Sequence, residues 1–153
     1  MGTYRVSFIG HREIFRLDRL TDLFEWFIRY ILKTKEYVEF YIGRNGDFDR
    51  WVSYIVKRIK KETGYGNCSL ILVLPYGGKA EKNYEGLYDE VKKPLDENTH
   101  YKIAITKRNE WLVDNSDLLI CYVENEMGGA YTTKLYAEKK GVKIINFAKI
   151  GWR

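Results

Sequence analysis

Residues 127–141, MGGAYTTKLYAEKKG, follow a strongly apolar run and have the composition of a loop that holds a phosphate. The pair Gly128-Gly129 lets backbone N–H groups approach an anion closely, and a helical pattern begins directly after it. The N-terminus of that helix would add a partial positive charge, and Thr132 and Thr133 could donate hydroxyl groups. The stretch matches neither the GxGxxG dinucleotide fingerprint nor the GxxxxGK(S/T) phosphate loop. It therefore predicts an anion site, and it leaves open whether the loop only holds a ligand or also cleaves one.

Glycines, arginines and polar side chains also follow the other apolar runs that we predict to be strands. Because ligands of open parallel sheets bind outside the carboxyl ends of the strands, these residues are expected to converge on one rim. The arginines suit bidentate contacts with phosphate, and Tyr76 or Phe48 could stack on a base. The candidate ligand-binding residues are Gly10, His11, Arg12, Gly43, Arg44, Asn45, Gly46, Asp47, Phe48, Tyr76, Arg108, Glu124, Gly128, Gly129, Thr132 and Thr133.

Several of these candidates have a structural explanation as well. Gly10 can be a turn glycine, and Gly43 and Gly46 bracket a turn that any fold can contain. Asp47 can cap a helix, and His11 can be a surface histidine in a loop. Since the chain has only two histidines, we expect no His-based metal site, and no motif calls for a cofactor.

The elements that must position these residues alternate along the chain. Strands are predicted at 4–9, 37–42, 69–74, 117–123 and 143–147. Amphipathic helices are predicted at 18–34, 47–62, 107–115 and 129–140. Asp18 is the expected N-cap of the first helix and Gly141 the expected C-cap of the last. This order predicts an α/β fold, a Rossmann-like three-layer sandwich with a mainly parallel sheet of five or more strands and helices on both faces.

Residues 77–101 interrupt the alternation. The segment contains GGK, NYEG and KKPLDENTH, which favour a loop or an irregular helical excursion. It is longer than an ordinary connection, so we expect a lid or an oligomer contact.

The composition fits a single domain over residues 1–153. Hydrophobic residues make up 45% and charged residues 31%, which excludes a disordered chain. The net charge of +5 is mild and scattered, so we rank a nucleic-acid partner behind a small anionic ligand. No apolar run approaches the roughly 20 residues of a membrane span, and no signal-peptide pattern is present. We therefore expect a cytoplasmic protein without a membrane partner. The surplus of aromatics such as Trp26 and Tyr30 could fill a large core or line a contact between copies of the chain, and we expect a homo-oligomer.

Several motifs taken together resemble the SLOG superfamily, in particular its small single-domain bacterial and phage branch. The matching stretches are FIGHRE (8–13), YIGRNGDFDRWV (41–52), LVLPY (72–76), KRNEWLVDNSDLLICYV (107–123) and GGAYTTKLYAEKKGVKIIN (128–146). The resemblance implies a Rossmann-like fold that binds nucleotides. Some members are cytokinin-activating phosphoribohydrolases, which split nucleoside monophosphates into base and ribose phosphate. Others resemble sensors of cyclic ADP-ribose signals in antiviral defence.

The hydrolases in this superfamily carry the signature PGGxGTxxE. Gly128, Gly129 and Thr132 match it, Tyr131 replaces the third glycine, and Leu135 stands at the position of the glutamate. In the hydrolases that glutamate is the acidic group at the scissile bond, a role that leucine cannot fill. The hydrolase arginine ahead of the fourth strand corresponds to Arg108. Carboxylates that could substitute for the glutamate are Asp47, Asp49, Glu124, Glu126 and Glu138.

Three functions remain open on this basis. The first is non-catalytic binding of a small nucleotide, an ADP-ribose derivative or a cyclic ADP-ribose isomer, which a phage could use as a sponge for a defence signal. The second is a phosphoribohydrolase or related N-glycosidase that uses another carboxylate. The third is binding of single-stranded nucleic acid, which would require a steep dependence on salt.

Overall fold

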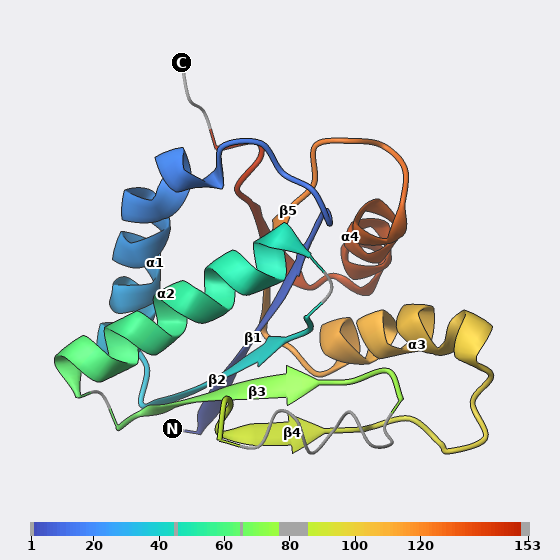
Figure 1. Cartoon of the computed structure of the whole chain (residues 1–153), viewed down its shortest axis with the longest axis horizontal. Coiled ribbons are helices and arrows are strands. Elements are labelled where there is room, and N and C mark those ends of the chain that lie inside the picture. The colour runs from blue at the N-terminus through green and yellow to red at the C-terminus, as the bar shows by residue number, and fades with distance from the viewer. Residues whose placement is uncertain (1, 45, 65, 77–85, 151–153) are drawn as a thin grey trace.

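Six parallel strands form the centre of the computed structural model, which describes residues 2–44, 46–64, 66–76 and 86–150 (Figure 1). The strands are β1 (Thr3–Gly10), β2 (Tyr37–Ile42), β3 (Cys68–Val73), β4 (Glu90–Lys92), β5 (Leu118–Tyr122) and β6 (Lys143–Asn146). They lie in the order β4-β3-β2-β1-β5-β6, and every neighbouring pair is parallel. The sheet is therefore larger than the five strands that the sequence pattern identifies.

Helices cover both faces of this sheet (Figure 1). They are α1 (Thr21–Thr34), α2 (Asp47–Thr63), α3 (Tyr101–Asp114) and α4 (Gly129–Lys140), with a short 3-10 helix, η1 (Leu17–Leu20), ahead of α1. α1 packs with α2 against one face, and α3 packs with α4 against the other. This arrangement confirms the predicted Rossmann-like sandwich with three layers.

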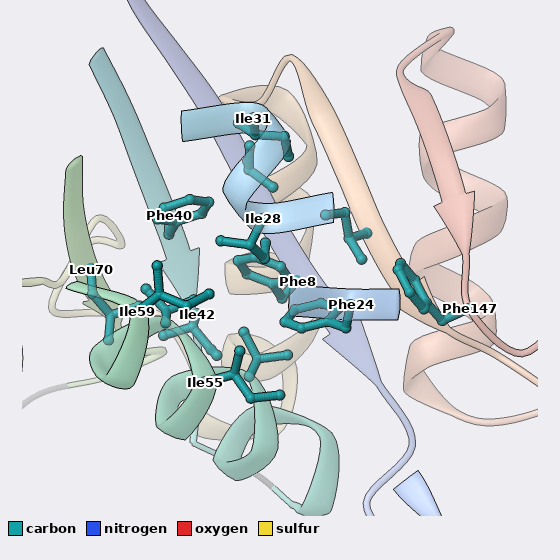
Figure 2. Packing of buried hydrophobic residues seen from close by; sticks show 14 of the residues in the cluster. Phe8, Phe24, Ile28, Ile31, Phe40, Ile42, Ile55, Ile59, Leu70 and Phe147 are labelled. Carbon is teal, nitrogen blue, oxygen red and sulfur yellow. The ribbon is translucent and has the colours of Figure 1, made fainter. Parts of the chain in front are cut away.

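Each strand at the centre contributes side chains to both layers, because successive residues of a strand point to opposite faces. In β1, Phe8 packs into the cluster under α1 and α2, while Ile9 packs into the cluster under α3 and α4. Figure 2 shows the first cluster, where the Phe8 and Phe24 ring centroids lie 6.0 Å apart and those of Phe24 and Phe147 5.4 Å apart. Burial on both faces explains the continuous apolar runs of the central strands.

Three features of the structure differ most from the sequence-based expectations. α3 begins at Tyr101, six residues before the predicted start, and β4 lies inside the segment that the sequence predicts to be irregular. Asp18 is not the N-cap of α1: its carboxylate pairs with Arg16 Nε at 2.9 Å, and α1 begins only after η1. Gly141 does end α4, with the positive φ of 77° that favours glycine.

The strand order places a topological switch point between β1 and β5. From β1 the chain builds outward through β2, β3 and β4 in one direction, and β5 and β6 then extend the sheet in the other. Gly10 at the end of β1 lies in register with Tyr122 at the end of β5. In open sheets of this kind, the crevice for a ligand lies where the two directions diverge.

Candidate functional site

A pocket with a volume of about 400 Å³ opens at this switch point. It lies where the end of β1 meets the starts of α2 and α4 and the middle of α3. The lining residues are Ile9, Gly10, His11, Arg12, Asp49, Ile105, Arg108, Asn109, Gly128, Gly129 and Ala130. Residues far apart in the sequence thus meet in one concave site, and its volume falls in the usual range for small-molecule pockets.

Arg108 is the most buried cation in the part of the chain that the structure describes, with 3% of the residue exposed. Its Nε donates to Asn109 Oδ1 at 2.9 Å, and its Nη1 donates to the Val73 carbonyl at 2.7 Å. Burial lowers the pKa of the guanidinium, and the nearby Asp49 carboxylate opposes that shift. Because free arginine ionises far above neutral pH, Arg108 keeps its charge and holds it in a fixed position at the pocket.

Gly43 makes room for this guanidinium. A Cβ at position 43 would lie 2.9 Å from Arg108 Nη1 and 3.1 Å from Asp49 Oδ2. Any side chain at the end of β2 would therefore displace the arginine or the carboxylate. Gly43 does not line the pocket itself, and its part in the site is to leave space for Arg108 and Asp49.

The start of α4 forms another wall of the pocket. Gly128 is the N-cap and has φ 93°, a conformation that other residues rarely adopt. The first bond of the helix runs from the Thr132 N–H to the Gly128 carbonyl at 3.0 Å. The N–H groups of Gly129, Ala130 and Tyr131 therefore have no acceptor within the helix, and they supply the partial positive charge of its N-terminus. A Cβ at Gly129 would meet nothing within 4 Å, so this wall is open to a ligand.

The hydroxyl groups of Thr132 and Thr133 are used within the helix. Thr132 Oγ1 donates to the Gly128 carbonyl at 3.0 Å, and Thr133 Oγ1 donates to the Gly129 carbonyl at 2.8 Å. Neither threonine lines the pocket. The predicted role of both hydroxyls as donors to a ligand is therefore not seen in this arrangement, in which they donate to carbonyl groups of the first turn of α4.

His11 lies at the pocket and joins the two strands at the switch point. Its Nε2 accepts hydrogen bonds from the backbone N–H groups of Glu124 at 2.8 Å and Asn125 at 3.2 Å. Burial lowers the pKa of His11, with a smaller opposing effect from the Glu124 carboxylate. The sequence predicts that Glu124 contacts the ligand, but its N–H bonds to His11, and the residue lines a separate cavity between α4 and the segments that follow β5 and β6.

Two predicted contact residues lie away from the pocket. Phe48 is fully buried in the core, and a Cβ at Gly10 would meet its ring at 2.3 Å. In this conformation the Phe48 ring therefore lies in the core and does not reach the pocket. Tyr76 is exposed but lines another cavity with Lys93 and Asp96, beyond the end of β3.

The remaining candidates from the loop after β2 support the site indirectly. Gly46 packs so closely that its Cβ would lie 2.5 Å from the Arg12 Cα. The Asp47 N–H donates to the Arg12 carbonyl at 2.7 Å, and Asp47 Oδ2 accepts the Ile14 N–H at 3.0 Å. These contacts hold Arg12 at the pocket. Arg44 is exposed and does not line the pocket, and Asn45 falls outside the described residues.

The structure also adds residues that the sequence pattern does not select as ligand contacts. Ile105 and Asn109 line the pocket beside Arg108, since residues three and four apart share one face of a helix. Asp49, considered from the sequence only as a substitute acid, is the one carboxylate that lines the pocket in the described part of the chain. Leu135, at the position of the hydrolase glutamate, lines this separate cavity with Glu124 and Glu138.

Comparison with known proteins supports the fold and leaves the family open. No family model and no curated protein matches the chain. Among solved structures, DNA processing protein A (DprA) from Streptococcus pneumoniae superposes with a TM-score of 0.63 and 16% identity, over 92% of this chain and 49% of that one. DprA from Helicobacter pylori, which binds single-stranded DNA, gives a TM-score of 0.61 and 14% identity, over 92% of this chain and 63% of that one.

These similarities define the class of fold. At 14–16% sequence identity, the structural match shows a Rossmann-like fold for this chain. The chain spans only about half to two thirds of the DprA proteins' length, 49% and 63%. Within the described ranges, no helix has both the length and the apolar character that crossing a bilayer requires.

Proposed function

We propose that this chain binds a small phosphorylated nucleotide in the pocket at the switch point and leaves it intact. The observation that carries the proposal is the buried Arg108 guanidinium, fixed by Val73 and Asn109 in a pocket whose other wall is the open start of α4. A fixed cation that shares a pocket with a helix N-terminus suits the binding of phosphate oxygens.

The remaining lining residues suit the rest of a nucleotide. Asp49 can accept hydrogen bonds from sugar hydroxyl groups, and Ile9 and Ile105 offer apolar surface to a base or ribose. Arg12 adds a second cation at the rim. The pocket thus has a positive part for a phosphate and a mixed part for a nucleoside.

We further propose that the ligand is an ADP-ribose derivative or a cyclic ADP-ribose isomer. The support is the resemblance to SLOG proteins that read such signals, together with the apolar Leu135 where the hydrolases have their acid. A protein that binds this ligand without cleaving it could sequester a defence signal, and we place that role in the cytoplasm. Asp49 is the residue on which a retained N-glycosidase activity would depend, because it is the one acid that lines the pocket among the residues that the structure describes.

Single-stranded DNA is a second candidate ligand. The observation that favours it is the structural similarity to DprA from Helicobacter pylori, which binds single-stranded DNA. This similarity favours a nucleic-acid partner more strongly than the scattered charge alone does. A strand held mainly through its phosphates would lose affinity steeply with salt, whereas a nucleotide enclosed in a pocket would lose much less.

The decisive experiment compares two variants at one position. Gly129→Asp and Gly129→Asn have nearly the same shape, and the structure leaves open space for either side chain. The first turn of α4 holds no acidic residue, so the aspartate variant should be tolerated or even stabilised at the helix N-terminus. Its charge would repel a bound phosphate. We expect Gly129→Asp to weaken ADP-ribose binding at least about tenfold relative to Gly129→Asn, measured by calorimetry.

The same preparation identifies the ligand class. The protein is incubated with AMP, NAD, ADP-ribose, cyclic ADP-ribose isomers and an oligothymidylate, freed of unbound material and heat-denatured, and the released molecules are analysed by mass spectrometry. Release of an intact ADP-ribose-type ligand supports the proposal. Free base and ribose phosphate would show hydrolysis, and Asp49→Asn would then be the variant to test. Binding of the oligonucleotide alone, with a steep dependence on salt, would replace the proposal with single-stranded DNA binding.

A further inference from the structure

His11 is the side chain that ties the loop before α4 to the end of β1. It follows Gly10 directly, and its backbone N–H donates to the Tyr122 carbonyl of β5 at 3.3 Å. Its ring meets the Tyr122 ring edge-on, with the centroids 6.4 Å apart. Through Nε2 it also accepts the N–H groups of Glu124 and Asn125, the residues at the start of the loop that leads to Gly128.

These contacts fix the protonation state of the ring. An imidazole nitrogen that accepts two N–H groups carries no proton, so the proton of neutral His11 must lie on Nδ1. If Nε2 became protonated, it would face two backbone donors and could accept neither. Both hydrogen bonds would be lost together, and with them the direct link between His11 and the loop after β5.

The charged groups around His11 influence the pH at which Nε2 becomes protonated. Glu124 lies in the loop that His11 holds, and its carboxylate favours the protonated ring, while burial favours the neutral ring and has the larger effect on the pKa. Arg12 on the same loop, Asp49 on α2 and Arg108 on α3 line the same pocket. A bound phosphate would be a further anion in this pocket.

We propose that His11 is a positioning residue that holds the start of α4 in its ligand-binding arrangement only while its imidazole is neutral, so that protons antagonise ligand binding. The inference rests on the proposed function, because the ligand is the one that Arg108 and the α4 N-terminus would hold. It concerns how the site is regulated, and it assigns His11 a role through Glu124 and Asn125 in place of a direct contact.

The direction in which ligand affinity changes with pH distinguishes this role from a direct electrostatic attraction between His11 and the ligand. A histidine that touched an anionic ligand would bind it more tightly once protonated, so affinity would rise as the pH falls. A histidine that holds the loop through an acceptor nitrogen predicts the reverse. The probe must not itself titrate in this range, and ADP-ribose is suitable because its bridging phosphates lack the second ionisation that phosphate monoesters have near pH 6.

The test follows ADP-ribose affinity by calorimetry between about pH 8 and about pH 5 for three proteins. The wild type should bind several-fold more weakly at the acidic end. His11→Gln keeps an acceptor oxygen near the position of Nε2 but cannot be protonated there, so its affinity should stay near the wild-type value at high pH and change little with pH. His11→Phe keeps a ring but has no acceptor, and it should bind weakly throughout. Affinity that rises on acidification in the wild type would overturn the proposal.

A second measurement follows the hydrogen bonds between His11 and the loop in the absence of ligand. The chain has two histidines, so ¹⁵N-histidine NMR gives two ring systems that are readily assigned. His100 accepts the Lys102 N–H at Nδ1, so the two histidines should show opposite neutral tautomers. The amide signals of Glu124 and Asn125 should shift with the same midpoint as the His11 ring. If His11 titrates while these amides stay fixed, the loop role is wrong even where ADP-ribose binds. If the amides follow His11 but ADP-ribose binds at no pH, the loop role stands and the proposed function fails.

Discussion

At the scale of single residues, burial of the Arg108 guanidinium at the pocket lowers the stability of the fold. Removing a guanidinium from water is unfavourable, and the structure offsets this with the Val73 carbonyl, the Asn109 side chain and the neighbouring Asp49. Such a cation has little reason to be buried in a core that only needs packing. The position of Arg108 at a pocket supports its proposed role in binding an anion.

Two substitutions of Arg108 should separate its effect on folding stability from its effect on ligand binding. Arg108→Met keeps much of the volume but leaves Asp49 beside an uncharged side chain, so we expect the free energy of unfolding to fall by about 3–5 kcal/mol in urea denaturation. Arg108→Lys keeps a charge but cannot reach Val73, Asn109 and a phosphate at once, so it should weaken ADP-ribose binding more than it weakens folding.

The control for Arg108 is the double variant Arg108→Met with Asp49→Asn. If the loss of the guanidinium beside the carboxylate causes much of the destabilisation, the double variant should be less destabilised than the sum of the two single variants. Strict additivity would show that Asp49 and Arg108 do not interact, and the electrostatic account of the pocket would then be wrong.

At the scale of elements, the pocket depends on how closely α2 approaches the end of β1. Gly10 has no side chain, and the Phe48 ring of the first turn of α2 occupies the space that a Cβ would fill. This contact brings Asp49, one residue further along α2, to the pocket wall. Gly10 is therefore explained by packing as much as by the approach of a ligand, which is one of the alternatives that the sequence left open.

Substitution of Gly10 should disturb this packing. A Cβ at position 10 would lie 2.3–2.6 Å from three Phe48 atoms, so Gly10→Ala must push α2 away or bend the end of β1. We expect a loss of about 1–3 kcal/mol in the free energy of unfolding, measured in urea. Gly129→Ala, where the space is open, is the matched control and should be neutral or slightly stabilising.

A smaller residue at position 48 tests the cause. In the Gly10→Ala background, Phe48→Leu should cost less than it does in the wild type, because the clash is relieved. An equal cost in both backgrounds would mean that the two residues do not compete for space.

The sequence predicts the central strands and the first two helices well, because their apolar residues recur with a clear period. α3 is harder: its inward face carries Arg108 and Asn109 where a packed helix would have apolar residues, while Ile103 and Ile105 are exposed. The pocket therefore disrupts the pattern that would have shown where α3 begins. β4 is only three residues long and carries no alternating pattern, so it could not be separated from a loop.

Part of the candidate site could also be predicted from the sequence. Glycines and arginines at strand ends indicate the rim, and six of the predicted residues do line the pocket. They are Gly10, His11, Arg12, Arg108, Gly128 and Gly129. Which of the others face inward depends on the rotation of α2 and α4. That rotation turns Phe48 into the core and directs the Thr132 and Thr133 hydroxyls back to their own helix, and no spacing rule reveals it.

At the scale of the whole molecule, the notable surface lies on the outer side of α1. Trp26 and Tyr30 are 61% and 52% exposed, and their rings stack with centroids 5.6 Å apart. One helix turn separates them, so they form a continuous aromatic surface away from the pocket. Aromatic residues of this kind are enriched in protein interfaces.

We therefore predict that the protein is a homo-oligomer held together through Trp26 and Tyr30. Light scattering coupled to size exclusion should give a mass above that of one 18.2 kDa chain, and the double variant Trp26→Glu with Tyr30→Glu should shift it to the monomer. Tyr54→Glu is the matched control, because Tyr54 is 63% exposed on α2 and stacks on neither ring. Nucleotide affinity should be equal in all three proteins, since the aromatic surface and the pocket share no residue. A monomeric wild type at all concentrations would leave these aromatics without a partner and refute the assembly, while reduced affinity in the double variant would show that a neighbouring subunit completes the site.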